Sequence, residues 1–200
     1  MSTAAHAQEA DEALLQRYAG GDAAAFEALY DRHELGVWRY VLRSVRVEAV
    51  ADDLLQDVWF AVARQAAAYR PTARFKTWLF TLAHNRMVDH FRTAKQHLSL
   101  DGVGASGDDE PQAQTSLAET LAADSGFGPI AQLQSRQQAT ALLAAIEQLP
   151  APQREAFLLQ AEGGLSVDEI AASTGVSFET AKSRLRCARS SLRQTLREFA

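Results

Sequence analysis

Apolar residues recur every three or four positions along most of this chain, while alternation with a period of two is nearly absent. A spacing of three and four is typical of an amphipathic helix with one face turned to a core. The helices predicted in this way cover about residues 22–45, 48–68, 75–95, 136–149, 152–163, 166–174 and 177–197. The sequence therefore predicts an all-α protein.

Breaks in this pattern divide the chain into two helical modules. The stretch "YRPTAR" before Phe75 interrupts the first module only locally, because proline removes a backbone donor. A longer stretch from Ser99 to Pro129 is rich in Gly, Ser, Ala, Asp and Gln and lacks any cation. Such a composition buries too little apolar surface to offset the entropy of ordering. We predict modules over residues 11–96 and 135–198, joined by a flexible acidic linker over 97–134.

The end of the chain has the pattern of a helix-turn-helix. "SVDE" is a capping box, in which Ser166 and Glu169 satisfy each other's backbone donors at a helix start. Gly175 follows after a short helix and supplies a turn, and Ser177 caps a longer second helix. A short helix, a glycine turn and a long helix predict a module that places the second helix in the major groove of DNA.

Charge is distributed unevenly along the 200 residues. The chain has a formal net charge of -5, yet basic side chains cluster in residues 70–96 and 178–200. Clustered cations of this kind are compatible with nucleic-acid binding whatever the net charge of the chain. The acidic linker lies between these two basic clusters.

Composition excludes several other classes of protein. Because no apolar run reaches 18 residues and the first ten residues lack a signal pattern, we expect a cytoplasmic protein without membrane insertion. The single cysteine, Cys187, excludes a disulfide framework and a thiolate zinc site, and the histidines are scattered. We find no glycine loop for phosphates, nucleophile elbow or paired carboxylates. We therefore expect no metal, no cofactor and no enzyme.

The last helix has one apolar stripe, from Phe178 to Leu196, and a polar face opposite it. Forked or short polar side chains on such a face suit base edges, and flanking cations suit phosphates. Arg186 is the best candidate for bidentate recognition of guanine. The candidate residues for duplex binding are Thr180, Lys182, Ser183, Arg184, Arg186, Cys187, Arg189 and Arg193. A solvated amphipathic helix without a ligand is the alternative.

Two surfaces of the first module are also candidates for binding. On the helix over 48–68, an aromatic residue is surrounded by polar ones, in the set Asp53, Gln56, Asp57 and Phe60. This is the composition of a docking surface with an aromatic anchor, although Phe60 could instead pack under the preceding helix. On the next helix and the loop before it, cations and an aromatic suit single-stranded nucleic acid, in the set Tyr69, Arg70, Arg74, Asn85, Arg86, Arg92 and Lys95.

The segments "DDLLQDVWFAVARQ", "FKTWLFTLAHNRMVDHFR" and "LPAPQREAFLLQAEGGLSVDEIAASTGVSFETAKSRLRCARSSL" together resemble bacterial sigma factors of the extracytoplasmic-function (ECF) group of the sigma-70 family. The resemblance covers both modules in order. It implies that the first module corresponds to sigma region 2, a helical bundle, and the second to sigma region 4. In this sequence Cys187 takes a position where the family often has an arginine, so the preference at the -35 element is expected to differ.

The resemblance also implies roles and partners. Asp53, Gln56, Asp57 and Phe60 would dock on core RNA polymerase. The loop over 69–74 and the helix with Asn85 would recognise and hold open the melted -10 element, and the terminal helix would read the -35 element as duplex DNA. An anti-sigma factor is a further implied partner. The alternative function is an autonomous helix-turn-helix regulator, in which the Phe60 surface would be a dimer interface.

Overall fold

The computed structural model describes residues 9–100 and 129–197, and within these ranges the side chains of 97–100, 129–137 and 196 are left out of the description. Over the described residues the chain forms helices and no strand, as the sequence predicts. The elements are α2 (Asp11–Ala19), α3 (Ala23–Val45), α4 (Glu48–Gln65), the 3₁₀ turn η1 (Ala66–Ala68), α5 (Phe75–Leu100), α7 (Pro129–Gln148), α8 (Ala151–Ala161), α9 (Val167–Thr174) and α10 (Phe178–Arg197).

The local signals that predict helix boundaries are confirmed. The side chain of Asp22 accepts a hydrogen bond from the backbone of Ala24 at the start of α3. Ser166 and Glu169 form the complete capping box of α9, and Gly175 ends that helix in the left-handed conformation at φ 66°. Ser177 accepts from the backbone nitrogen of Thr180 at 3.2 Å and so caps α10. These contacts lie within a few residues of each other, which is why the sequence alone predicts them.

Two features of the helices differ from the prediction. α2 is a nine-residue helix that the apolar pattern did not single out. Both α5 and α7 are longer than predicted and enter the segment 97–134, because α5 ends at Leu100 and α7 begins at Pro129. No glycine or proline interrupts residues 75–100, and proline is tolerated at the first position of a helix. The rest of the predicted linker lies outside the described residues, and the module boundaries remain a prediction.

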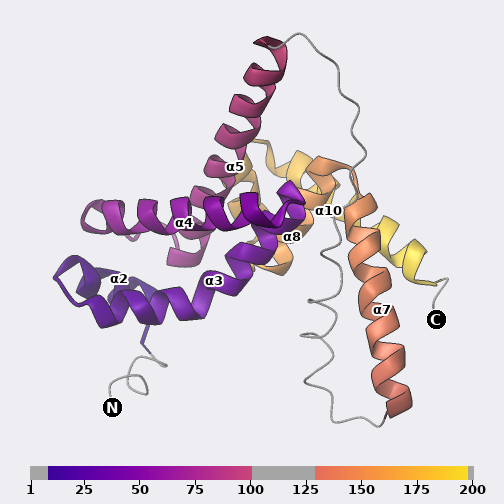
Figure 1. Ribbon diagram of the computed structural model, residues 1–200, viewed down its shortest axis with the longest axis horizontal. Coiled ribbons are helices and arrows are strands. Elements are labelled where there is room, and N and C mark those ends of the chain that lie inside the picture. Colours follow the sequence, from indigo (N-terminus) through magenta and orange to yellow (C-terminus); the bar gives the residue numbers. More distant parts are fainter. Residues whose placement is uncertain (1–8, 101–128, 198–200) are drawn as a thin grey trace.

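The first module packs α2, α3, α4 and α5 around a continuous apolar core, with α5 crossing α3 and α4 at a steep angle (Figure 1). The part of α4 that faces this core includes Leu54, Val58 and Val62, whereas Val50 and Leu55 are only half-buried. Phe75 and Leu79 of α5 are fully buried, and Trp78 lies partly exposed beside them. The C-terminal half of α5 projects beyond the rest of the module (Figure 1).

The second module is formed by α7, α8, α9 and α10. The apolar stripe of α10, with Ala181, Leu185, Ala188 and Leu192, is buried against α7, α8 and α9. Phe178, which the pattern placed on the same stripe, is instead 41% exposed. It is the first residue of α10, so the preceding helices do not extend over it, and Lys182 lies 5.6 Å above its ring. The prediction of a buried Phe178 was wrong.

The two modules pack directly against each other, which the sequence did not predict. α9 lies against α5, and α8 lies against α3. Buried residues of both modules belong to one continuous cluster. The surfaces discussed below are therefore arranged on one packed molecule.

Candidate nucleic-acid and partner interfaces

The predicted docking surface on α4 is exposed along its whole length. Asp53, Gln56, Asp57 and Phe60 are all on the outside of the molecule, and Phe60 is 56% exposed. The alternative, in which Phe60 packs under the preceding helix, is therefore wrong. A large aromatic side chain between carboxylates costs free energy in water unless a partner covers it, so this surface is compatible with docking.

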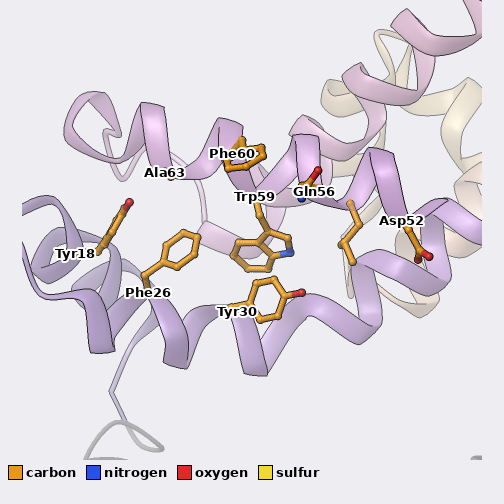
Figure 2. A pocket seen from close by; sticks show the side chains of 9 residues that line it. Tyr18, Phe26, Tyr30, Asp52, Gln56, Trp59, Phe60 and Ala63 are labelled. Carbon is orange, nitrogen blue, oxygen red and sulfur yellow. The ribbon is translucent and has the colours of Figure 1, made fainter. Parts of the chain in front are cut away.

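A hollow lined by aromatic side chains lies next to Phe60, between α4 and the helices α2 and α3 (Figure 2). Its volume is about 650 Å³, and its lining includes Tyr18, Phe26, Tyr30 and Trp59. Trp59 is only 4% exposed and packs edge-on against Phe26, with ring centroids 5.6 Å apart. Sequence analysis missed these residues of α2 and α3. The signal that was available is the spacing of four between Phe26 and Tyr30, which places both rings on one face of a helix.

The loop between η1 and α5 is held in shape by its own contacts. The hydroxyl of Tyr69 donates to the backbone carbonyl of Ala73 at 2.9 Å, and its ring lies 5.0 Å from that of Trp78. Tyr69 is thus half-buried, while Arg70 and Arg74 are exposed. The structure brings these three candidates together at the start of α5.

The other -10 candidates lie further along α5. Asn85, Arg92 and Lys95 are exposed and Arg86 is half-buried. Arg92 forms an ion pair with Asp89 at 3.0 Å on the helix surface. At 1.5 Å per residue, the 21 residues from Arg74 to Lys95 extend over roughly 30 Å, so the candidates form a line rather than a cluster.

Two exposed apolar residues on α5 were also missed. Val88 and Phe91 are large hydrophobic side chains that stand in water beside Arg92 and Lys95. The ring of Phe91 contacts only that of His90 among the aromatic rings of the described residues, at 5.6 Å. They lie on the stripe that continues Thr77, Thr81 and His84, a pattern that a helical wheel could have shown.

On α10 the predicted reading face is accessible. The candidates Thr180, Lys182, Ser183, Arg186, Cys187, Arg189 and Arg193 are exposed, and Arg184 is half-buried. Lys182 lies 3.8 Å from Glu179, and Arg189 donates to the side-chain oxygen of Gln160 on α8. Arg186 and Cys187 lie in the middle of the exposed face. The arrangement fits a helix that inserts into a groove with cations on either side.

Several hydrogen-bond donors converge on one carboxylate between the two modules, that of Glu169. Its carboxylate accepts from Nη2 of Arg74 at 2.7 Å and Nε of Arg74 at 3.1 Å, from the hydroxyl of Thr77 at 2.6 Å and from the backbone of Ser166 at 2.8 Å. These donors, Arg74 first, lower the pKa of Glu169 from 4.5 to about 2. One of the candidate -10 cations is therefore already paired in this structure.

Comparison with known proteins agrees with this geometry. The model of Sigma-70 region 2 matches residues 29–97, and that of Sigma-70, region 4 matches residues 139–192. The ECF RNA polymerase sigma factor SigL of Mycobacterium tuberculosis is 31% identical over 186 residues, which cover 90% of this chain and 94% of SigL. The chain belongs to the ECF sigma factors. The RNA polymerase sigma factor CarQ of Myxococcus xanthus is 33% identical over 185 residues, covering 92% of this chain and 97% of CarQ.

The matched ranges include most of the candidate surfaces of this sigma factor. Region 2 covers the docking candidates of α4 and every -10 candidate, and region 4 covers every -35 candidate except Arg193. α2, which lines the aromatic hollow, precedes the region 2 match.

Solved structures share the fold of this sigma factor. The sigma factor RpoE of Bartonella quintana, in complex with the anti-sigma factor NepR, aligns with a TM-score of 0.63 at 23% identity, over 86% of this chain and 96% of RpoE. CnrH, in complex with the cytosolic domain of CnrY, aligns with a TM-score of 0.61 at 23% identity, over 96% of this chain and 100% of CnrH.

Proposed function

We propose that this ECF sigma factor binds core RNA polymerase through the α4 surface of Asp53, Gln56, Asp57 and Phe60. The -10 element is held open by the loop over 69–74 and the exposed face of α5. The -35 duplex is read by α10. The observation that carries this proposal is that regions 2 and 4 match in order, on exposed surfaces whose composition suits each partner.

The physical chemistry of the three surfaces supports their separate tasks. An exposed aromatic ringed by acidic and amide groups suits a protein partner. A line of cations with an asparagine suits single-stranded DNA, whose unpaired bases need hydrogen-bond donors and acceptors. A capped helix with a central arginine suits the major groove of a duplex.

The protein itself supplies no chemical step in this proposal, since nucleotide addition belongs to the polymerase. It acts in the cytoplasm, where that partner works, and among the described residues no helix is long and apolar enough to cross a membrane. Because RpoE and CnrH were solved with NepR and CnrY, we also propose an anti-sigma factor as a partner that keeps the protein inactive.

A reconstituted transcription assay tests the proposal. Core RNA polymerase is incubated with genomic DNA in the presence and absence of the purified protein, and the 5′ ends of the transcripts are sequenced. We expect a new set of start points that share two upstream sequence elements. If the protein neither binds core polymerase nor changes the start points, the proposal fails, and the autonomous regulator becomes the better account.

A further inference from the structure

A carboxylate of α2 holds the first residue of α5, at the end of the loop over 69–74. Oε1 of Glu12 accepts a hydrogen bond from the backbone nitrogen of Phe75 at 2.7 Å, although the two residues are 63 positions apart. The first backbone N–H groups of a helix have no partner within the helix, and a carboxylate there also interacts favourably with the helix dipole. Phe75 is fully buried and directly follows the loop. Glu12 therefore fixes the point at which the loop ends.

α2 is itself anchored in the module, so the fold sets the position of Glu12. In the residue before it, Oδ2 of Asp11 lies 2.8 Å from Nε2 of His33 on α3. His33 is 7% exposed, and its ring lies 5.5 Å from that of Phe75. Leu15 of α2 is fully buried. A rotation of α2 would break these contacts, so the carboxylate of Glu12 is held next to the start of α5.

The side chains of the loop face solvent, so the loop depends on its ends for its position. Residues 70–74 are all exposed, and Tyr69 is half-buried. The hydroxyl of Tyr69 donates to the carbonyl of Ala73 at 2.9 Å, and the backbone nitrogen of Thr72 donates to the carbonyl of Arg70 at 2.7 Å. These bonds fix the shape of the loop. Its place on the module depends on η1 and α5 at its two ends, and α2 contacts both.

The carboxylate of Glu12 also acts on the loop through its charge. Burial raises the pKa of the Tyr69 hydroxyl above its usual value, and the charges of Glu12 and Asp11 raise it further. The start of a helix is otherwise a binding site for phosphate, because its backbone N–H groups and its dipole attract anions. Since Glu12 occupies this position on α5, we expect a DNA phosphate to contact the exposed cations Arg70 and Arg74 instead.

We propose that Glu12 is a positioning residue for the -10 element and that α2 is the support of the loop over 69–74. By holding Phe75, the carboxylate sets the distance and orientation at which the loop side chains meet an unpaired base. A displacement of about 1 Å is enough to weaken a site of this kind. The inference rests on the proposed function, in which this loop holds the -10 element open. It goes beyond the family match, since α2 lies before residue 29, where the match to Sigma-70 region 2 begins.

Two substitutions at Glu12 separate the position of the acceptor from its charge. Glu12→Gln keeps an oxygen acceptor on a side chain of the same length, whereas Glu12→Ala removes it. Glu27→Ala is the matched control, because it removes an exposed carboxylate of α3 in the same module. Each variant is combined with core RNA polymerase on a promoter that the unchanged protein selects. Each of the four bases is placed in turn at each position of the -10 element, and transcription is measured.

We expect Glu12→Ala to lower the preference for the best base at one -10 position roughly fivefold, the effect of one lost hydrogen bond. Glu12→Gln should keep most of this preference, and Glu27→Ala should keep all of it. Affinity for core polymerase and preference at the -35 element should stay unchanged in the three variants. An unchanged -10 preference in Glu12→Ala, equal losses in both Glu12 variants, or a parallel loss at the -35 element would each overturn the inference.

Hydrogen exchange tests the support without the polymerase. In the free protein, amides at the start of α5 should exchange several-fold faster in Glu12→Ala, because the amide of Phe75 loses its acceptor. Amides of α4 should not change, and Glu12→Gln should stay close to the unchanged protein. Equal exchange at the start of α5 in Glu12→Ala would contradict a supporting role. If the unchanged protein directs no transcription, the proposed function fails instead, and the exchange rates still decide whether Glu12 holds the loop.

Discussion

At the scale of single residues, Glu169 has two structural tasks. It completes the capping box of α9 through Ser166, and it joins the modules through Arg74 and Thr77. The capping role is visible in the sequence as "SVDE", and the second role depends on Arg74, which is 95 positions away. A substitution that keeps one task and removes the other can therefore separate them.

The low pKa of Glu169 predicts a dependence of stability on pH. Because its pKa falls from 4.5 to about 2 on folding, the ionised carboxylate stabilises the folded state above pH 4.5, and this contribution is lost as the pH falls toward 2. We expect Glu169→Gln to lower the free energy of unfolding by about 1 kcal/mol at neutral pH, since the pair with Arg74 is largely exposed to solvent. Thermal unfolding of the variant and the unchanged protein at pH 7 and pH 3 measures this loss of stability. A loss of the same size at both pH values would contradict its origin in the ionised carboxylate.

The exposure of Phe60 predicts that Phe60→Ala weakens binding to core polymerase without lowering the stability of the fold. Because its side chain is exposed, Phe60→Ala removes little buried area and should leave the melting temperature unchanged. As an anchor at a protein interface it should cost about 2 kcal/mol, or roughly thirtyfold in affinity for core polymerase. Leu35→Ala, which removes another exposed apolar side chain of the same module, is the control for fluorescence-based titration. Equal losses from both would exclude an anchor role.

At the scale of elements, α5 has one face that is buried in the fold and another that exposes -10 candidates to solvent. Its N-terminal half packs against α9 and exposes Asn85, and its C-terminal half projects with Arg92 and Lys95 exposed. The buried face fixes the rotation of the helix, so the exposed side chains point away from the core.

Asn85→Ala should therefore impair strand opening more than initial binding. The asparagine side chain offers both a donor and an acceptor to an unpaired base, which a closed duplex does not present. Permanganate reactivity of -10 thymines reports opening, and a gel shift with core polymerase reports total binding. Thr93→Ala on the same helix is the control. An equal decrease in both signals would place Asn85 in closed-complex formation.

α10 should discriminate bases through Arg186 in particular. Arg186→Ala is expected to relax selection at one base pair of the -35 element by about 1–3 kcal/mol, since a bidentate contact to guanine is lost. Arg197→Ala, an exposed cation in the last turn of the same helix, should weaken binding without changing selection. Competition between promoter variants in transcription measures the preference. Unchanged selection in the Arg186 variant would move base recognition to another residue of the face.

At the scale of the whole molecule, the two modules share one apolar cluster and several ion pairs. Unfolding is therefore expected to be a single cooperative transition, because neither module can open without exposing the surface that it shares with the other. Calorimetry of a Glu162→Gln, Glu169→Gln double variant, which removes two inter-module ion pairs, should show a broadened or split transition. Two separate transitions in the unchanged protein would contradict the packed arrangement.

The sequence by itself determined most of the helices and several of their ends, since caps such as Asp22 and Ser166 and the turn at Gly175 act over a few residues. Helical periodicity also selected the candidate residues on α4, α5 and α10, and composition selected those of the loop over 69–74. Their docking, -10 and -35 roles are implied by the family resemblance and remain predictions. Helical periodicity failed to predict burial where a residue lies on the apolar face of its helix but beyond the helices that cover that face. Phe178 lies on the apolar stripe of α10 but beyond the helices that would cover it, and its exposure follows.

Only the tertiary structure decided that Phe60 stands in solvent and that the modules pack together. Both depend on contacts between segments with no local relation in the chain, such as α5 with α9 and α3 with α8. A helical wheel shows which side chains share a face, and it does not show which other helix lies against that face. The sequence shows that Arg74 is a cation, and only the fold shows that its partner is Glu169.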